Sequence, residues 1–148
     1  MILWRVSNYP TLDGVGGLYV SGRWHTKGHP VVYCILNPAT ALLETLVHIE
    51  IDSEDRPERF RVLRIEGPDS LSLEKFENAS LPPNWAEDIT STQAIGDRWL
   101  TERHSLLLRV PSVLVPETWN VLLNPLHTEA SLLSITMTYE HAFDARLR

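Results

Sequence analysis

The chain has 148 residues, and 43% of them are hydrophobic. This is enough for one hydrophobic core, so we expect a single domain that spans residues 1–148. Its formal net charge is −6, so it lacks the excess of Lys and Arg that neutralises phosphates, and we expect no direct contact with nucleic acid. One cysteine, no signal-peptide pattern and no run of roughly 18 apolar residues predict a reducing, cytoplasmic location without a membrane span.

The first third of the chain predicts three strands and one helix. The strands are expected at residues 2–6, 18–20 and 31–36. Five of the seven glycines lie in residues 14–28, between the first strand and the third. Asn37 is a good N-cap and Pro38 suits the first helical position, so a helix should run from Pro38 to about Ile49.

One face of this helix is expected to be buried, because six apolar residues recur at helical spacing. They are Ala39, Leu42, Leu43, Leu46, Val47 and Ile49. Glu44 lies off this arc, with Ala41, Thr45 and His48. We therefore expect Glu44 beside the core and not within it.

The remainder of the chain predicts more strands than helices. Strands are expected at residues 60–66, 106–115, 119–125 and 133–139, a helix at 91–103, a helical turn at 127–131, a charged turn at 52–59, and a loop region with at most one short helix at 70–88. Pro111 marks a sheet edge or a bulge, since proline cannot donate to a ladder. The mixture is neither a regular βαβ alternation nor all-β, so the predicted class is α+β.

Taken singly, the candidate site residues have ordinary explanations. The loop with Gly14, Gly16 and Gly17 suggests a phosphate cradle, but no Walker Lys-Ser/Thr pair and no full G-x-G-x-x-G follows, so a tight turn is the commoner reading. Arg23 fits a diphosphate clamp and a cation–π pair with Trp24 equally well.

Three further candidates also have ordinary readings by base rate. Tyr33 reads as a core aromatic residue, Glu44 as a solvated helix residue, and Ser112 as a bulge residue without a hydrolase motif. The histidines have no spacing typical of a metal site, and His25 and His29 lie on a Gly/Pro loop. We therefore expect no metal.

Several short motifs together have an order and spacing that resemble the RES-domain family, over nearly the whole chain. They are Arg5, Gly14-Val-Gly16-Gly17, Gly22-Arg23-Trp24, Tyr33, Ala41-Leu-Leu-Glu44, Gly96-Asp97-Arg98-Trp99-Leu100, Val110-Pro111-Ser112, Leu123-Asn124-Pro125 with His127, and Phe143-Asp144 with Arg146-Leu147. That family is named for an Arg, a Glu and a Ser, and it supplies the toxins of RES–Xre toxin–antitoxin pairs. Many relatives have Asn where His25 stands and Pro where Thr128 stands.

The resemblance implies an ADP-ribosyltransferase-like mixed sheet and the consumption of NAD⁺. Its members hydrolyse or phosphorolyse NAD⁺ or, in some cases, transfer ADP-ribose to a protein. The family's arginine, tyrosine, glutamate and serine fall on Arg23, Tyr33, Glu44 and Ser112. It also implies an Xre-type DNA-binding antitoxin that forms a hetero-oligomer with the chain and blocks its site.

These residue types suit cleavage of the bond between nicotinamide and ribose, whose transition state resembles an oxocarbenium ion. Glu44 would stabilise the positive charge, and Arg23 would grip the diphosphate, with Arg5 as a second candidate. Tyr33 would stack on nicotinamide, and Ser112 would hydrogen-bond the ribose or the amide. Gly16, Gly17 and Asn124 are assigned to substrate binding, and neither a metal nor a second cofactor is needed.

Three functions remain open from the sequence. The favoured one is an NAD⁺ glycohydrolase or phosphorylase, the second is a protein ADP-ribosyltransferase, and the third is a non-catalytic module that binds a nucleotide or an antitoxin.

Overall fold

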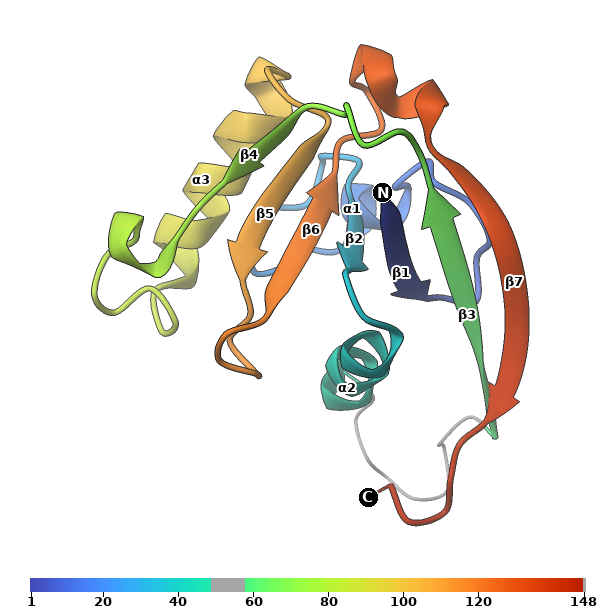
Figure 1. The fold of residues 1–148 in the computed structure, drawn as a ribbon. Coiled ribbons are helices and arrows are strands. Elements are labelled where there is room, and N and C mark those ends of the chain that lie inside the picture. Colours follow the sequence, from blue (N-terminus) through green and yellow to red (C-terminus); the bar gives the residue numbers. More distant parts are fainter. Residues whose placement is uncertain (49–57, 148) are drawn as a thin grey trace.

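The computed structural model describes residues 1–48 and 58–147, and seven strands of that part form one mixed sheet (Figure 1). The strands are β1 (Ile2–Val6), β2 (Val32–Ile35), β3 (Arg59–Glu66), β4 (Leu73–Lys75), β5 (Leu107–Pro111), β6 (Trp119–Leu123) and β7 (Ser134–Ala142). Their order in the sheet is β4-β5-β6-β2-β1-β3-β7. Neighbours are antiparallel except for β4 and β5, which are parallel. The predicted α+β class with a mixed sheet is confirmed.

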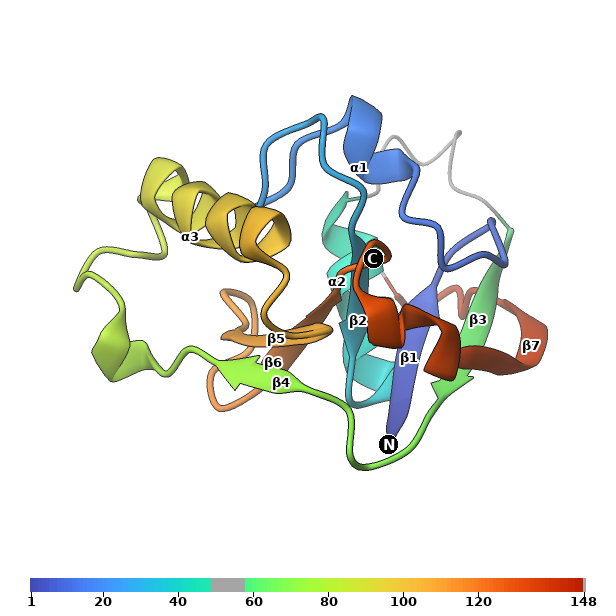
Figure 2. The same ribbon diagram turned by 90° about the horizontal axis from the view of Figure 1, so that it is seen from above.

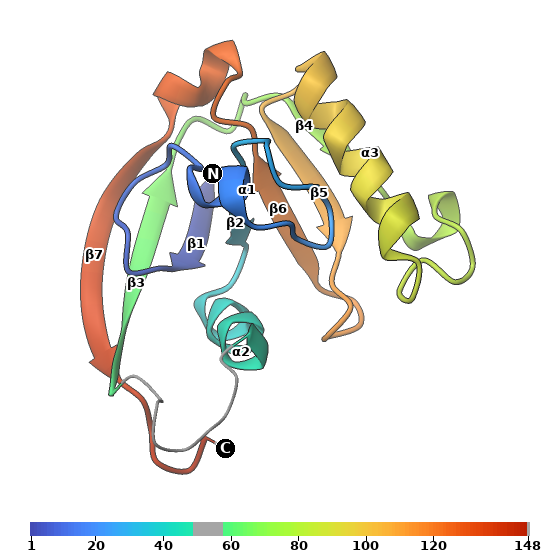
Figure 3. The same cartoon turned by 180° about the vertical axis from the view of Figure 1, so that it is seen from behind.

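The helices lie on one face and at one end of this sheet. They are α1 (Gly16–Tyr19), α2 (Pro38–His48) and α3 (Ile89–Glu102), with 3₁₀ turns η1 (Asn78–Ser80) and η2 (Thr128–Leu132). Figure 2 shows α1 and α3 on the same side of the sheet. From behind, the segment between α1 and β2 passes over β5 and β6, while α2 lies beyond the end of β2 (Figure 3). This arrangement brings the glycine-rich segment close to α3.

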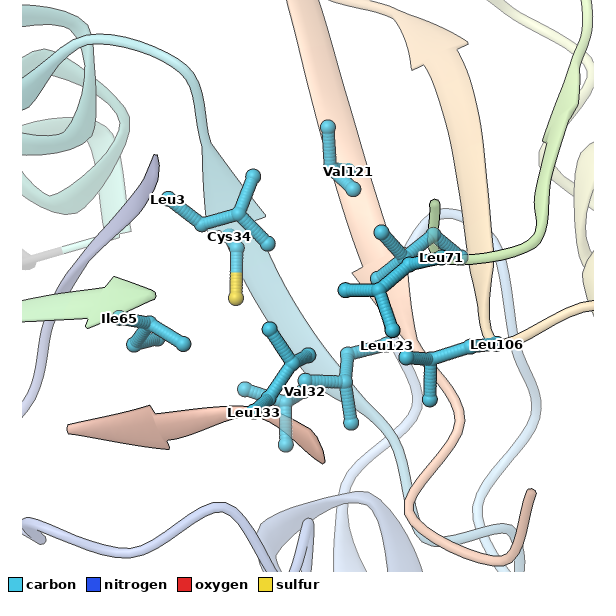
Figure 4. Close-up of a cluster of buried hydrophobic side chains, with 10 residues drawn as sticks. Leu3, Val32, Cys34, Ile65, Leu71, Leu106, Val121, Leu123 and Leu133 are labelled. Atoms are coloured by element: carbon cyan, nitrogen blue, oxygen red, sulfur yellow. The ribbon is translucent and has the colours of Figure 1, made fainter. Parts of the chain in front are cut away.

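Two groups of buried side chains form the core on opposite faces of the sheet. Along β6, Val121 and Leu123 belong to one group and Leu122 to the other, as expected from the alternation of side chains in a strand. Figure 4 shows the first group, around Leu3, Val32, Cys34 and Ile65. The second group lies under α3 and includes Trp24, which is 1% exposed. The loop that carries Trp24 is therefore part of the core.

The strand expected at residues 18–20 is wrong, because the segment coils into α1. Backbone N–H groups of Gly17 and Leu18 donate to carbonyls three residues earlier, at 3.0 Å each. A Cβ on Gly17 would lie 2.4 Å from the carbonyl oxygen of His29. The backbone at Gly17 thus packs too closely on the following loop for a side chain.

The helix expected from Pro38 is confirmed as α2, but the predicted buried face is wrong. Leu43 and Val47 are 42% and 56% exposed, whereas Ala41 is 3% exposed. The helix contacts mainly β1 and β2, and Ala41 is its buried residue, while Leu42 and Leu46 of the predicted arc are half-buried. The predicted end at Ile49 and residues 52–57 of the charged turn lie outside the described residues.

Other local predictions are confirmed. α3 begins after Asp88, whose side chain accepts a hydrogen bond from the N–H of Ser91 at 3.0 Å, an N-cap. β5 lies inside the sheet, and its last residue, Pro111, pairs with Trp119 of β6. Pro111 lies beyond the residues that β4 pairs with, so the predicted edge is present there on the β4 side alone. The predicted short helix in residues 70–88 is η1, and that region also contributes β4. No helix of the described residues has the length and apolar character needed to span a membrane.

Candidate active site

A cavity of about 440 Å³ lies where α2, the strands β1 and β2, and the loop around Arg23 meet. Its lining residues come from six separate segments of the chain. They are Trp4, Arg5, Val6, Gly22, Arg23, Trp24, Tyr33, Cys34, Ile35, Ala41, Glu44, Thr45, Val47, His48, Val113, Leu114 and Asn120. This volume lies within the usual range for a small-molecule site.

Glu44 is held at the wall of this cavity by two polar side chains. The Ser112 hydroxyl donates to Glu44 Oε1 at 2.8 Å and accepts the N–H groups of Leu114 and Val115. Asn120 Nδ2 lies 3.4 Å from the same carboxylate oxygen. A carboxylate only accepts hydrogen bonds, so the amide NH₂ of Asn120 must face it. Both contacts use Oε1, and among the described residues Oε2 receives no hydrogen bond.

Two arginines line the same cavity. Arg23 Nη1 donates to the carbonyl of Ala86 at 2.8 Å, and Arg5 Nη1 donates to the carbonyl of Thr11 at 3.2 Å. Burial lowers the pKa of Arg5, although a guanidinium stays protonated in proteins. Each recorded bond uses one nitrogen of a group with five N–H donors. The cavity therefore suits a ligand with an anionic part near the arginines and a cationic part near Glu44.

Tyr33 is fixed through its hydroxyl by a chain of hydrogen bonds. His25 Nε2 lies 3.0 Å from the carbonyl of Val20, which can only accept, so Nε2 carries the proton. His25 Nδ1 then accepts from the Tyr33 hydroxyl at 2.8 Å, and that hydroxyl accepts the N–H of Trp24 at 3.2 Å. Burial raises the pKa of Tyr33 well above its usual value, so the phenol keeps its proton. A Cβ on Gly22 would lie 2.5 Å from this hydroxyl, and glycine there leaves room for it.

Four predicted substrate-binding residues lie outside this cavity's lining, and one of them, Ser112, is tied to it by its hydrogen bond to Glu44. Gly16 and Gly17 belong to α1. Asn124 is 1% exposed, and its side chain donates to the carbonyl of Leu100 at 3.0 Å and accepts the N–H of Leu126 at 3.1 Å. Their assignment to substrate stays a prediction, and the proposal below does not depend on it. The structure does bring together Arg5, Arg23, Tyr33, Glu44 and, through its hydrogen bond, Ser112.

Comparison with known protein families gives a match to the RES domain over residues 2–144. The chain belongs to the RES domain family. It is 49% identical over 135 residues to a Pseudomonas putida protein named Toxin Res, covering 91% of this chain and 92% of that one. It is 34% identical over 140 residues to a Sphingobium protein named Prs ADP-ribosylating toxin, covering 92% and 86%.

A solved structure shares the RES domain's fold. It is the M. tuberculosis MbcT-MbcA toxin–antitoxin complex, one chain of which superposes with a TM-score of 0.77 at 15% identity, covering 95% of this chain and 84% of that one. At this identity the likeness shows the fold alone. It agrees with the confirmed α+β class.

Sequence reasoning missed three residues of this RES domain's site. Asn120 has no local signal, because it is a lone amide in an apolar strand; only the pairing of β6 with β2, which sets it opposite Ile35, brings it to α2. The role of His25 depends on its contact with Tyr33, which the spacing of the two residues does not predict. Trp24 is part of a family motif, but its burial depends on α3. Within residues 1–48 and 58–147, no group of three or more His, Cys, Asp or Glu side chains is placed to hold a metal ion.

The link between His25 and Tyr33 predicts a pH-dependent stability. Burial lowers the pKa of His25 from its ordinary value of 6.5, against smaller opposing effects of backbone hydrogen bonds and Asp97, while His29 lowers it further. Between the folded pKa of His25 and about pH 6.5, the unfolded chain therefore binds more protons than the folded chain. Neutral His25 stabilises the fold fully above about pH 6.5, and this stabilisation is lost as the pH falls through the folded pKa. His25→Asn removes the contribution. We expect the difference in unfolding free energy between wild type and His25→Asn to shrink from pH 7.5 to pH 5, measured by urea unfolding; a constant difference would contradict the neutral assignment.

Proposed function

We propose that this RES domain is the toxin of a toxin–antitoxin pair and that it degrades NAD⁺ by cleaving the nicotinamide–ribose bond. The observation that carries the proposal is the carboxylate of Glu44, held by Ser112 in a cavity that also contains Arg5, Arg23 and Tyr33. The printed names of the relatives from Pseudomonas and Sphingobium support the toxin assignment and a reaction of ADP-ribose.

The chemistry assigns one main role to Glu44. The bond from ribose C1′ to the nicotinamide nitrogen breaks, and its electron pair leaves with nicotinamide as a neutral ring. Positive charge then develops on the ribose, as in glycoside cleavage. A carboxylate beside that sugar stabilises this charge, and the oxygen Oε2 is available for a ribose hydroxyl. The acceptor, water or phosphate, then bonds to C1′ and loses a proton to solvent.

The rest of the cavity suits the remainder of NAD⁺. Arg23 and Arg5 offer charge-assisted hydrogen bonds for the diphosphate, and the exposed part of the Tyr33 ring offers a face for nicotinamide. NAD⁺ is the substrate, and the proposal needs no metal and no other cofactor.

The acceptor is the point on which two candidate reactions differ. The name of the Sphingobium relative favours a protein acceptor as the second candidate. NAD⁺ labelled with ³²P in the adenylate phosphate separates the possibilities when it is incubated with the purified chain in water, with inorganic phosphate, and with a bacterial extract. We expect free nicotinamide together with ADP-ribose or ADP-ribose 1-phosphate. Label in a protein band would select the transferase, and an absence of nicotinamide in all three mixtures would overturn the proposal and favour a non-catalytic binding module.

Arg23→Lys is expected to lower kcat/KM for nicotinamide release by about tenfold or more. An ammonium keeps the charge but loses the planar fork that contacts two phosphate oxygens, and a hydrogen bond to a charged group contributes roughly 1.5–3 kcal/mol. Steady-state kinetics check this, with Arg98→Lys as a control, since Arg98 does not line the cavity. Unchanged KM and kcat in Arg23→Lys would indicate that Arg5, and not Arg23, binds the diphosphate.

The partner we propose is an Xre-type antitoxin that contacts DNA and covers the cavity, with the toxin acting in the cytoplasm. Three apolar side chains beside the cavity support a covering protein: Leu36, Leu43 and Val47 are 48%, 42% and 56% exposed. The solved structure that shares this fold is a toxin–antitoxin complex, which also supports a covering partner. Titrating the product of the neighbouring gene against nicotinamide release should abolish turnover at saturation. Turnover at the free rate within a stable complex would exclude occlusion.

A further inference from the structure

A second cavity of about 510 Å³ is lined in part by Ala86, whose carbonyl accepts the hydrogen bond from Arg23. It is bounded by η1, by the segment before α3, and by the turn that joins β5 to β6. Its lining residues are Glu77, Asn78, Ala79, Trp85, Ala86, Pro111, Ser112, Val113, Pro116, Glu117, Thr118 and Trp119. None of the roles assigned to the first cavity uses this space.

The two cavities share walls at three points. Val113 lines both. Ser112 lines the second cavity, and its hydroxyl donates to Glu44 in the first. Arg23 lines the first cavity, and its guanidinium donates to the carbonyl of Ala86 in the second. Arg23 therefore lies in the first cavity and is anchored to a residue that lines the second.

The walls of the second cavity suit a flat, weakly polar ring. Two tryptophans and two prolines contribute to the lining. The ring of Trp85 packs against that of Trp24, with a distance of 6.0 Å between the ring centroids. The guanidinium of Arg109 lies over the ring of Trp119, at 4.3 Å from its centroid. Both indoles are thus fixed before any ligand arrives. Aromatic side chains bind nucleobases by stacking, whatever the base.

The charged residues that line this second cavity are acidic, which disfavours the diphosphate there. Its charged lining residues are Glu77 and Glu117, and Arg109 pairs with Glu77 at 2.5 Å. Glu117 adds negative charge at the turn, so a phosphate is disfavoured there and favoured at Arg23. A neutral base meets no such penalty.

We infer that the second cavity is the adenine subsite, so that one NAD⁺ molecule spans both cavities with its diphosphate at Arg23. This inference rests on the proposed function. Nicotinamide and its ribose lie beside Glu44, and adenine stacks between the indole walls formed by Trp85 and Trp119. The alternative occupant is the acceptor, a side chain of a target protein that approaches from this side.

The test compares NAD⁺ with nicotinamide mononucleotide, which lacks the adenylate half. Trp119→Ala is expected to raise KM for NAD⁺ by at least about fivefold, the loss of one stacking contact, and to leave kcat/KM for the mononucleotide unchanged. The mononucleotide is an internal control for the Glu44–Ser112 pair, since both substrates need it. Trp119→Phe keeps an aromatic face and should restore most of the KM for NAD⁺.

Four results overturn the adenine assignment. In Trp119→Ala, these are an equal fall in kcat/KM for both substrates, unchanged kinetics with both, or less labelling of protein with an unchanged rate of nicotinamide release. The fourth is AMP binding, measured by calorimetry, that is the same in wild type and Trp119→Ala. If wild type cleaves neither nucleotide, the proposed reaction fails. Weaker AMP binding by Trp119→Ala would then still support the subsite, and equal binding would exclude it.

Discussion

Glu44→Gln is expected to lower the rate of nicotinamide release by about 10²–10³, the usual effect of removing one electrostatic contact to a transition state. The amide is isosteric, and its oxygen can still accept from the Ser112 hydroxyl that lies 2.8 Å from Oε1. The packing of α2 should therefore persist while the negative charge beside the ribose is lost. The measurement is steady-state release of nicotinamide from NAD⁺, with thermal unfolding of the same sample to confirm the fold.

The matched control for this change is Glu102→Gln. Glu102 is exposed at the end of α3 and does not line the cavity, so its loss removes the same charge from a distant site. We expect this variant to turn over at the wild-type rate. If folded Glu44→Gln also does so, Glu44 is not the catalytic carboxylate.

Gly96→Ala is expected to destabilise the protein by about 1–3 kcal/mol or more, and to reduce activity even where it remains folded. A Cβ on Gly96 would lie 1.6 Å from the carbonyl oxygen of Trp24 and 2.7 Å from its carbonyl carbon. The backbone of α3 must therefore separate from the loop that carries Trp24, and Arg23 precedes it directly. Urea unfolding measures the loss of unfolding free energy, and the rate of nicotinamide release measures the effect on the site.

Gly16→Ala is the matched control for Gly96→Ala. A Cβ there meets nothing within 4 Å, and alanine is favoured over glycine in a helix by roughly 0.8–1 kcal/mol. We expect unchanged or slightly higher stability in urea unfolding. Equal stability of the two alanine variants would show that α3 does not press on the Trp24 backbone.

Local signals predicted the elements that depend on local chemistry. Asn37 and Pro38 mark the start of α2 because capping and the fixed φ of proline act within one turn. Asn37 Oδ1 indeed accepts the N–H of Ala39 at 2.8 Å. The strands β3, β6 and β7 also lie close to their predicted ranges. The buried face of α2 does not match its prediction, because it is decided by which strands the helix covers, and Ala41 faces them while Val47 does not.

The site itself depends on contacts between distant parts of the chain. Glu44 and Ser112 are 68 positions apart, and their hydrogen bond forms because α2 follows β2, which pairs with β6, which pairs with β5. The family resemblance supplied both residues. It did not supply Asn120, which reaches Glu44 only through the register of β2 with β6. Composition and periodicity contain no information on that register.

The most direct test of the central claim is a crystal structure of the Glu44→Gln variant with NAD⁺. The variant should bind the dinucleotide without consuming it. The account predicts the nicotinamide ribose within hydrogen-bond distance of residue 44, the diphosphate on Arg23, and nicotinamide against the ring of Tyr33. NAD⁺ bound away from residue 44, with its diphosphate on other side chains, would contradict it.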